Sequence, residues 1–261
     1  MNETFLPYSA PSCCPEKELA ARSSHALPLP RIEARLAQNG IKLTSNRTLL
    51  SSGLYGDMYL LDTTTGPIVE RTYGCRPPSA DSTPCRYRFR TSSHRQLPSY
   101  STLRLITTDG QVDIVDPLTN EASALSLLSD LPGIPRYYCS VTEGKRGSNL
   151  VAYIDGFDLV FLSEYVSHPQ QIIKIFAQIR ITYLSACERG FFIHDLAGSC
   201  IMIDSASLNP YLTDWQNHSR LDPTSPLAQA EIARSLELLE WLEYSLLETA
   251  FTPTTEARLG H

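Results

Sequence analysis

The sequence predicts an α+β protein in which an antiparallel sheet precedes a short helical part. The first observation is a series of strand patterns joined by tight turns over residues 47–73. The second is a pair of long amphipathic helices, expected over 170–189 and 227–251. The third is a pair of aspartates, Asp195 and Asp214, each placed just after a short apolar strand. Strands that come first and helices that come last indicate the α+β class.

The composition indicates a folded protein without a membrane segment. With 261 residues, of which 42% are hydrophobic, the chain is long enough for one large domain or for two lobes with cores of their own. Its two tryptophans, Trp215 and Trp241, are expected to anchor these cores. No run of about 18 apolar residues is present, so no transmembrane helix is expected. Residues 1–30 lack the basic start and apolar core of a secretory signal, so a cytoplasmic location is expected.

The net charge and the cysteines argue against several other classes of protein. A net charge of −6 and a pI of about 5.5 disfavour a nucleic-acid partner, because phosphate binding requires a basic face. The seven cysteines are odd in number and lack CxxC spacing, which favours free thiols over a disulfide framework or a zinc site. A single bridge between Cys75 and Cys85 remains an alternative.

The first part of the chain is expected to contain a tail, a helix and a sheet. Residues 1–29 are rich in Ser, Pro and Ala without periodicity, which predicts a disordered segment. A short helix is expected over 30–39, ended by Gly40. Strands are then expected on either side of a glycine turn at 53–56, and again over 68–73.

The middle of the chain combines an insertion, a helix and further strands. Residues 74–117 form an apparent insertion, with a hairpin of 102–106 and 111–115. A helix is expected over 120–131, where it is stopped by a Pro-Gly pair. Further strands are expected over 135–141, 150–154 and 158–165.

The stretch 191–215 organises the rest of the chain. An apolar strand leads to Asp195, and a second pair of strands, 201–203 and 211–213, leads to Asp214. The two carboxylates are therefore expected at neighbouring loop ends. Such a pair suits a metal nucleotide, because one acid holds Mg²⁺ against the phosphates while the other orients a hydroxyl for attack.

The spacing of these residues resembles the catalytic and metal-binding loops of protein kinases. That family carries H-R-D-L-x-x-x-N, followed by a hairpin and D-F-G, and here residues 193–200 and 214–216 occupy the two motifs. The spacing of the two motifs is retained, but the residue types at four positions differ from the family pattern. Ile193 replaces the histidine, His194 the arginine, Cys200 the asparagine and Gln216 the glycine.

The resemblance extends to the glycine loop that covers the phosphates in kinases. By that match Gly53 and Gly56 take the second and third glycine places, and Tyr55 takes the aromatic place at the tip of the loop. Met58 takes the place of the residue that rests on adenine, and Ser51 stands where the first glycine is expected. An ordinary hairpin turn is the alternative interpretation.

The resemblance also implies a phosphate-binding cation paired with a helix glutamate. Kinases use a lysine on the third strand, and this chain has none there. Arg71 fits the lysine place of the V-A-I-K motif, whereas counting back from the next motif favours Arg104, and both remain open. Glu121 is implied as the glutamate, and the alternative is a surface glutamate that only favours the helix dipole.

Residues 161–166 resemble the last strand and hinge of a kinase N-lobe. By that match Ser163 is the gatekeeper, and the backbones of Glu164 and Val166 face the adenine edge. The resemblance thus implies a bilobal protein kinase-like fold with an antiparallel-sheet N-lobe and a short helical C-lobe. The expected parts are a disordered segment 1–29, an N-lobe 30–166 with an insertion at 74–117, a C-lobe 167–252 and a tail 253–261.

The function that the resemblance implies is transfer of phosphate from ATP, with Mg²⁺, to Ser or Thr hydroxyls of a protein. Asp195 would orient the acceptor hydroxyl, Asp214 would hold the metal, and Cys200 stands in the place of a second metal ligand. The lost lysine, asparagine and glycines leave open a second hypothesis, a catalytically inactive pseudokinase that acts as a protein-binding module. Transfer of another nucleotide-derived group, such as AMP, is a third.

The partner and the location follow from the same resemblance. A C-lobe this short is similar to those of secreted effector kinases of bacterial pathogens and of some fungal kinase-like proteins. Only four of the 22 basic residues are lysines, which a GC-rich genome explains, or selection against ubiquitin acceptors in a host cytosol. The expected partner is a protein substrate or binding partner. It is a host protein if the chain is a secreted effector. Delivery into a host cytosol without a Sec signal is the alternative to residence in the cell's own cytoplasm.

Overall fold

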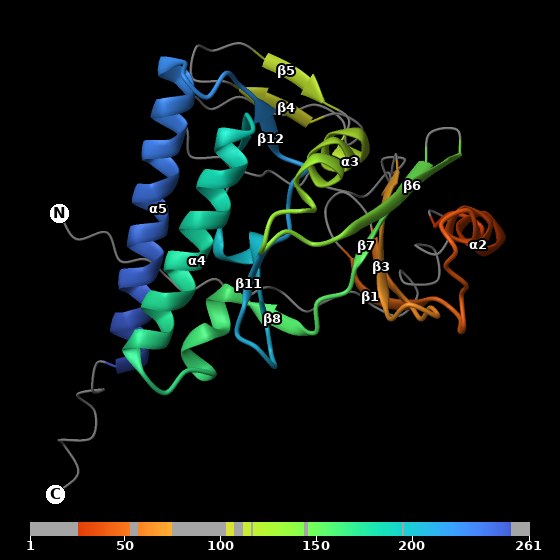
Figure 1. Cartoon of the computed structure of the whole chain (residues 1–261), viewed down its shortest axis with the longest axis horizontal. Coiled ribbons are helices and arrows are strands. Elements are labelled where there is room, and N and C mark those ends of the chain that lie inside the picture. The colour runs from red at the N-terminus through yellow and green to blue at the C-terminus, as the bar shows by residue number, and fades with distance from the viewer. Residues whose placement is uncertain are drawn as a thin grey trace, which may run out of the picture.

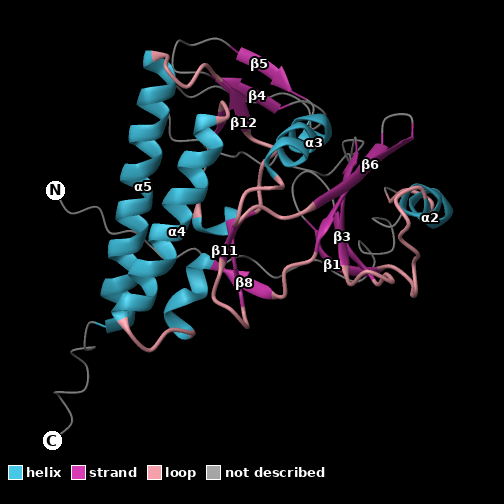
Figure 2. Ribbon diagram, viewed as in Figure 1, coloured by secondary structure: helices cyan, strands magenta, loops and turns pink. Residues whose placement is uncertain are grey.

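The structure is an α+β arrangement of antiparallel sheets and a few helices, so the predicted fold class is confirmed (Figures 1 and 2). This computed structural model describes residues 26–52, 57–74, 103–106, 112–115, 117–143, 146–194 and 196–251. A five-stranded sheet lies at one end of the molecule, and the long helices α4 and α5 lie side by side at the other (Figure 1). Among the helices described, none is long and apolar enough to cross a membrane.

The described elements run from a short helix through the strands to a long final helix. The helices are α2 (Leu29–Ala37), α3 (Pro117–Leu128), α4 (Pro169–Glu188) and α5 (Pro226–Phe251), with the 3₁₀ helices η2 (Leu159–Glu164) and η3 (Gly198–Cys200). The strands are β1 (Thr48–Ser52), β2 (Asp57–Leu61), β3 (Ile68–Gly74), β4 (Leu103–Ile106), β5 (Val112–Val115), β6 (Tyr137–Glu143), β7 (Arg146–Ala152), β8 (Gly156–Asp158), β9 (Phe191–Ile193), β10 (Ile201–Asp204), β11 (Pro210–Leu212) and β12 (His218–Arg220). The tail expected at 253–261 lies outside the described residues.

The largest sheet has the strand order β1-β2-β3-β7-β6, and every neighbouring pair in it is antiparallel. Side chains alternate between the two faces along each strand. On β3, Val69, Arg71 and Tyr73 therefore share one face, whereas Ile68 and Glu70 share the other. This alternation sets Arg71 on the face that α3 covers.

Helix α2 covers the opposite face of the sheet. Ile32 and Leu36, four residues apart on one side of α2, are completely buried. They pack against Leu61, Ile68 and Leu150 from three neighbouring strands and form a small core with them. The helix predicted over 30–39 is thereby confirmed, and its role is to shield the back of the sheet.

The larger core lies between the sheet, α3 and the long helices. Phe176 and Tyr183 of α4 are completely buried in it, as is Trp215, the predicted core anchor. Val69 and Val151 extend the same core onto the sheet. The sheet and the helical part are therefore joined through one continuous apolar interior, and the chain segments between them are held in place by it.

The strand predicted over 158–165 is wrong. Only Gly156–Asp158 forms a strand, and the chain then turns into the 3₁₀ helix η2. Leu159 and Leu162, three residues apart, are completely buried, whereas Val160 between them is half-exposed. A spacing of three is that of a 3₁₀ turn, and a strand would instead bury every second residue.

Three smaller differences also separate the sequence pattern from the structure. Trp241, expected in a core, has 58% of its surface exposed on α5. The disordered segment predicted over 1–29 extends too far, because Leu27 is buried in the core beside α2 and that helix begins at Leu29. Residues 1–25 lie outside the described part. The pattern does not predict β12, which pairs with β9, because its residues lack apolar alternation.

Candidate functional site

Arg71 and Glu121 form an ion pair between the middle strand of the large sheet and α3. The Arg71 guanidinium donates a hydrogen bond from Nη1 to Oε1 of Glu121. The Glu121 side chain is completely buried, and 17% of the Arg71 side chain is exposed. Of the two arginines that the resemblance offers, Arg71 is therefore the partner of Glu121. Arg104 lies on β4, which pairs with β5 in a separate two-stranded sheet.

Glu121 accepts hydrogen bonds from two more side chains of the sheet. The Tyr73 hydroxyl donates to Oε2 over 2.6 Å, and Asn149 Nδ2 donates to the same oxygen over 2.9 Å. The strand register explains why they converge: Asn149 lies opposite Arg71 on β7, and Tyr73 lies two residues along β3 on the same face. Asn149 Nδ2 also lies 3.0 Å from the backbone oxygen of Leu118, so α3 is tied to the sheet at its first turn.

The environment keeps Arg71 charged and Tyr73 neutral. Burial acts to lower the pKa of Arg71, but Glu121, with smaller contributions from Tyr73 and Asp214, raises it above the usual range overall. Burial raises the pKa of Tyr73 well above its ordinary value, and the adjacent Glu121 carboxylate raises it further. At neutral pH the site therefore contains a permanent cation and a neutral hydroxyl donor.

Asp214 follows the β10–β11 hairpin and lies close to this ion pair. Arg71 Nη1 donates to the backbone oxygen of Thr213 over 2.5 Å, which ties the residue before Asp214 to the sheet. The Asp214 carboxylate lies 3.3 Å from Gln216 Nε2 and 3.9 Å from Cys200 Sγ. The structure thus brings together an arginine of the sheet, a glutamate of α3 and an aspartate of the hairpin.

A second residue of α3 holds the chain beyond Asp214. Asn120 Nδ2 donates to the backbone oxygen of Gln216 over 2.8 Å and to that of His218 over 3.0 Å. Trp215 is completely buried, and its carbonyl oxygen lies 2.7 Å from Nδ1 of His218. The backbone on both sides of Asp214 is therefore fixed by named side chains.

Asp195, the acid expected to orient the acceptor hydroxyl, lies outside the described residues. Its neighbour His194 is held from two directions. The His194 N–H donates to the backbone oxygen of Asn217 over 3.0 Å, and Arg234 of α5 donates to the His194 carbonyl over 2.6 Å. His194 Nδ1 also lies 3.5 Å from the buried carboxylate of Glu231 on α5. The chain that leads to Asp195 is thereby anchored to the final helix.

Of the residues matched to the glycine loop, the structure describes Met58. It lies on β2 directly opposite Arg71, and its side chain packs against the larger core. Gly53, Tyr55 and Gly56 lie outside the described residues. The strands on either side of that loop, β1 and β2, are paired as the sequence predicts.

Glu164 and Val166 do not lie on a strand, so the strand expected at their position is wrong, whereas the expected contact of their backbones with adenine stays a prediction. Glu164 ends η2 and is exposed, and Val166 is half-buried against the larger core. The chain leaves the five-stranded sheet at the end of β7, so residues 153–155 make the connection toward the helices. Leu159 and Leu162 of the apolar run after Asp158 pack into the helical core, and the run does not extend the sheet.

Asp214 fits a magnesium ion, and Cys200 does not. Carboxylate oxygens are the ligands that Mg²⁺ prefers, whereas a thiol is a soft ligand suited to other metals. Asp204 is committed elsewhere, because its Oδ1 accepts from the backbone N–H and the hydroxyl of Ser207, each over 2.7 Å. Within the described ranges no group of three or more His, Cys, Asp and Glu side chains could hold a metal. One carboxylate together with phosphate oxygens is nevertheless a usual way for proteins to bind Mg²⁺.

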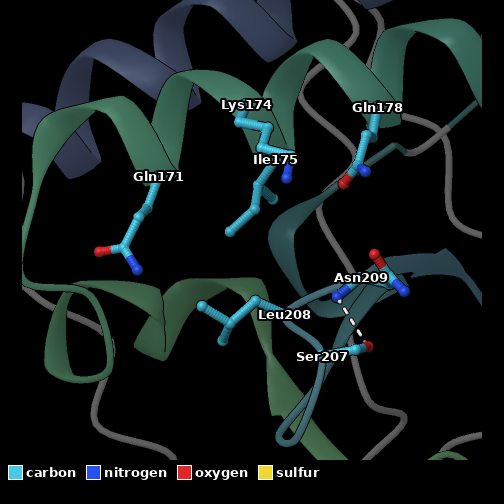
Figure 3. Close-up of a pocket in the computed structure, with 7 residues that line it drawn as sticks. All are labelled: Gln171, Lys174, Ile175, Gln178, Ser207, Leu208 and Asn209. Atoms are coloured by element: carbon cyan, nitrogen blue, oxygen red, sulfur yellow. Dashed lines mark hydrogen bonds between the residues drawn. The ribbon is translucent and has the colours of Figure 1, made fainter.

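A hollow of about 250 Å³ lies between α4 and the β10–β11 turn, away from these residues (Figure 3). Gln171, Lys174 and Gln178 of α4 face Ser207 and Asn209 across it, and none of them belongs to the ion pair or the Asp214 loop. Gln171 already serves as a helix cap, since its Oε1 accepts the backbone N–H groups of Ser167 and His168. This hollow is therefore separate from the candidate site.

Three contributors to the site have no signal in the sequence: Tyr73, Asn120 and Asn149. Each acts through a partner that the strand register or the helix position supplies. Residue types alone predict neither the register nor the helix position.

No protein-family model matches the chain, and no curated protein is significantly similar to it.

We expect the protein to lose stability in mild acid because the His218 ring is buried. Burial lowers its pKa from 6.5 to about 4, because the protonated ring is poorly solvated inside the protein. As the pH falls, the ring is therefore protonated in the unfolded chain before it is protonated in the folded one. The free energy of unfolding decreases over the interval from pH 6.5 to about 4. Urea unfolding should show a loss on the order of 3 kcal/mol over this interval from His218.

The matched variant is His218→Gln, which has no titrating ring. Its free energy of unfolding should fall less steeply between the two pH values than that of the wild type. Equal pH dependence in both proteins would show that the buried ring is not the group that titrates.

Proposed function

We propose that the protein is an ATP-dependent phosphotransferase with a bilobal protein kinase-like fold. In that family a cation on the third strand pairs with a helix glutamate and holds the nucleotide phosphates, and a later aspartate binds Mg²⁺. Here the third strand of the large sheet carries Arg71, α3 carries Glu121, and the hairpin leads to Asp214. The observation that carries the proposal is the simultaneous bonding of Arg71 to Glu121 and to the backbone of Thr213.

The Nε donor of Arg71 supports phosphate binding. Its Nη1 serves Glu121 and Thr213, while its buried Nε has no hydrogen-bond partner among the described residues. A guanidinium fork with free N–H groups matches two oxygens of one phosphate, and its charge stays fixed at all physiological pH values. A nucleotide phosphate would therefore satisfy a donor that is otherwise buried without a partner.

The acidic residues have distinct proposed roles. Asp214 would hold Mg²⁺, which when bound neutralises charge on the phosphate oxygens. Asp195 would accept the proton of the attacking hydroxyl, and its neighbour His194 is fixed by Arg234 and Glu231 of α5. The acceptor that the kinase resemblance implies is a Ser or Thr hydroxyl of a protein partner.

A catalytically inactive pseudokinase is the second candidate, and Cys200 favours it. The thiol stands in the place of a metal ligand and lies 3.9 Å from Asp214, where it offers Mg²⁺ no oxygen. Arg71 is also bonded to the chain's own Thr213 carbonyl. In a pseudokinase the same contacts would serve only to hold the sheet, α3 and the hairpin in one arrangement.

Transfer of labelled phosphate from ATP separates the two candidates. The wild type, incubated with Mg²⁺ or Mn²⁺, is expected to label itself or an added protein substrate. Asp195→Asn should reduce the rate by about 10²–10⁴-fold, the usual contribution of a positioned base. Asp222→Asn is the matched control, because Asp222 is exposed and, among the described residues, its carboxylate bonds Thr224 alone.

The mass of the labelled protein identifies the transferred group. A phosphoryl increment supports the kinase reaction, whereas an AMP increment would replace it with nucleotide transfer on the same site. If the folded wild type transfers nothing with either metal, the enzymatic proposal fails and the pseudokinase stands.

A further inference from the structure

Adjacent residues of α3 reach the backbone on both sides of Asp214. On one side, Glu121 bonds Arg71, and Arg71 bonds the carbonyl oxygen of Thr213. On the other side, Asn120 bonds the carbonyl oxygens beyond Asp214 directly, at 2.8 and 3.0 Å. One turn of one helix therefore contacts the loop after the aspartate directly and the residue before it through Arg71.

The contact from Asn120 depends on the amide chemistry of its side chain. An amide nitrogen has two N–H donors, and here they serve two carbonyl oxygens, those of Gln216 and His218. A carboxylate of the same shape has no donor to offer either carbonyl. The two carbonyls would lose these partners if α3 and the loop moved apart.

The helix turn that makes these contacts is itself fixed to the sheet. Asn149 of β7 lies 3.0 Å from the Leu118 carbonyl oxygen and 2.9 Å from Glu121 Oε2, so it spans the residues around Asn120. Glu121 is completely buried and receives three side-chain donors. The position of the Asp214 loop is thus set by the sheet, through α3.

We infer that Asn120 is a positioning residue that holds Asp214 where a metal-bound nucleotide phosphate would meet Arg71. This inference rests on the proposed function, because it assigns Asn120 a role in metal-dependent nucleotide binding. The expected consequence is that α3 and the Asp214 loop behave as one unit. Loosening Asn120 then weakens metal-dependent binding without weakening the helix.

Asn120→Asp keeps the shape of the side chain while it replaces both donors by a negative charge. The two side chains have nearly the same shape, and an acid in the first turn of a helix favours the helix dipole. A purely structural role in α3 therefore predicts little or no loss from this change. Ser126→Ala is the matched control on the same helix, because Ser126 is exposed and its hydroxyl donates only to Ser123 of its own helix.

The first readout is amide hydrogen exchange of the protein without nucleotide. In Asn120→Asp, the fragment 213–220 is expected to exchange about tenfold faster than in the wild type, and α4 to remain unchanged. Ser126→Ala should match the wild type in both fragments. Unchanged exchange of 213–220 in Asn120→Asp would overturn the inference at once.

The second readout is the Kd for ATP, measured with Mg²⁺ and with EDTA. Asn120→Asp is expected to reduce the gain in affinity that Mg²⁺ provides by about 10–100-fold, as the loss of a residue that orients a metal ligand does. The Kd in EDTA should change less, because only the general repulsion of the added charge acts on ATP without the metal. An unaltered gain from Mg²⁺, despite faster exchange, would contradict a role in positioning Asp214.

A different result identifies failure of the proposed function. If the wild type binds no ATP under either condition, the phosphotransferase proposal fails, and with it the role of Asn120 at a metal site. The exchange measurement would still decide whether Asn120 holds the loop, because it uses the protein without nucleotide.

Discussion

Replacement of Glu121 by alanine is expected to lower the free energy of unfolding by about 3–5 kcal/mol, because it leaves a buried charge uncompensated. Arg71 would lose its counter-ion, and Tyr73 and Asn149 would lose their acceptor. ATP binding should be lost as well, since nothing would then orient the Arg71 guanidinium toward a phosphate. Urea unfolding measures the first effect, and titration calorimetry with ATP and Mg²⁺ measures the second.

Two further variants separate charge, shape and function. Glu121→Gln keeps the shape and one acceptor oxygen, so its loss should be smaller, about 1–3 kcal/mol. The double variant Arg71→Met with Glu121→Leu replaces the pair by apolar side chains and should recover part of the stability lost in Glu121→Ala. It should still bind no ATP. A double variant that binds ATP as the wild type does would show that the pair is only structural.

Asp214→Ala is expected to remove the stabilisation that ATP and Mg²⁺ give the wild type. At a ligand concentration of 100 times Kd, binding adds about 2.7 kcal/mol. For a chain of this size, that corresponds to a rise in Tm of roughly 5–10 °C. Asp214→Ala should keep its own Tm within a few degrees and show almost no rise, because the carboxylate that would hold the metal is gone. Thermal denaturation with ATP, with and without Mg²⁺, provides the measurement.

The matched control for this measurement is Asp222→Asn, which removes an exposed carboxylate far from the ion pair in the sequence. Its rise in Tm should equal that of the wild type. Equal rises in Asp214→Ala and the wild type would mean that nucleotide binds without the hairpin aspartate, and the proposed metal site would be wrong.

The ion pair illustrates how far the sequence alone leads. The strand pattern around Arg71 and the helix pattern around Glu121 are both readable from the chain, and the structure joins these residues. The sequence does not decide between Arg71 and Arg104. Arg71 follows from the match to the V-A-I-K motif, whereas Arg104 follows from counting back from the helix that carries Glu121. The structure pairs Arg71 with Glu121, and Arg104 lies on a separate hairpin, whereas the arginine that would meet a phosphate stays a prediction.

Residue types alone do not predict the other hydrogen-bond donors to Glu121, Tyr73 and Asn149. Asn149 becomes its partner because β7 pairs with β3 in a register that sets Asn149 opposite Arg71. A shift of one residue would turn that side chain to the other face of the sheet. Long-range register depends on tertiary packing, so no local pattern around Asn149 announces its role.

The error at 158–165 has a local cause. A short apolar run is compatible with a strand or with a helical turn, and periodicity alone does not separate them. Burial of Leu159 and Leu162 against the helical core decides for the 3₁₀ helix. The exposed Trp241 shows a similar limit: its residue type suggests a core, but its position on α5 faces solvent.

The most direct test is the structure of the wild type with a non-hydrolysable ATP analogue and Mg²⁺. The expected result places phosphate oxygens about 3 Å from the Arg71 guanidinium, with the metal about 2.1 Å from an Asp214 oxygen. Glu121 should keep its bond to Arg71. A nucleotide bound elsewhere, for instance in the hollow beside α4, or no nucleotide at millimolar concentration, would contradict the assignment of this site.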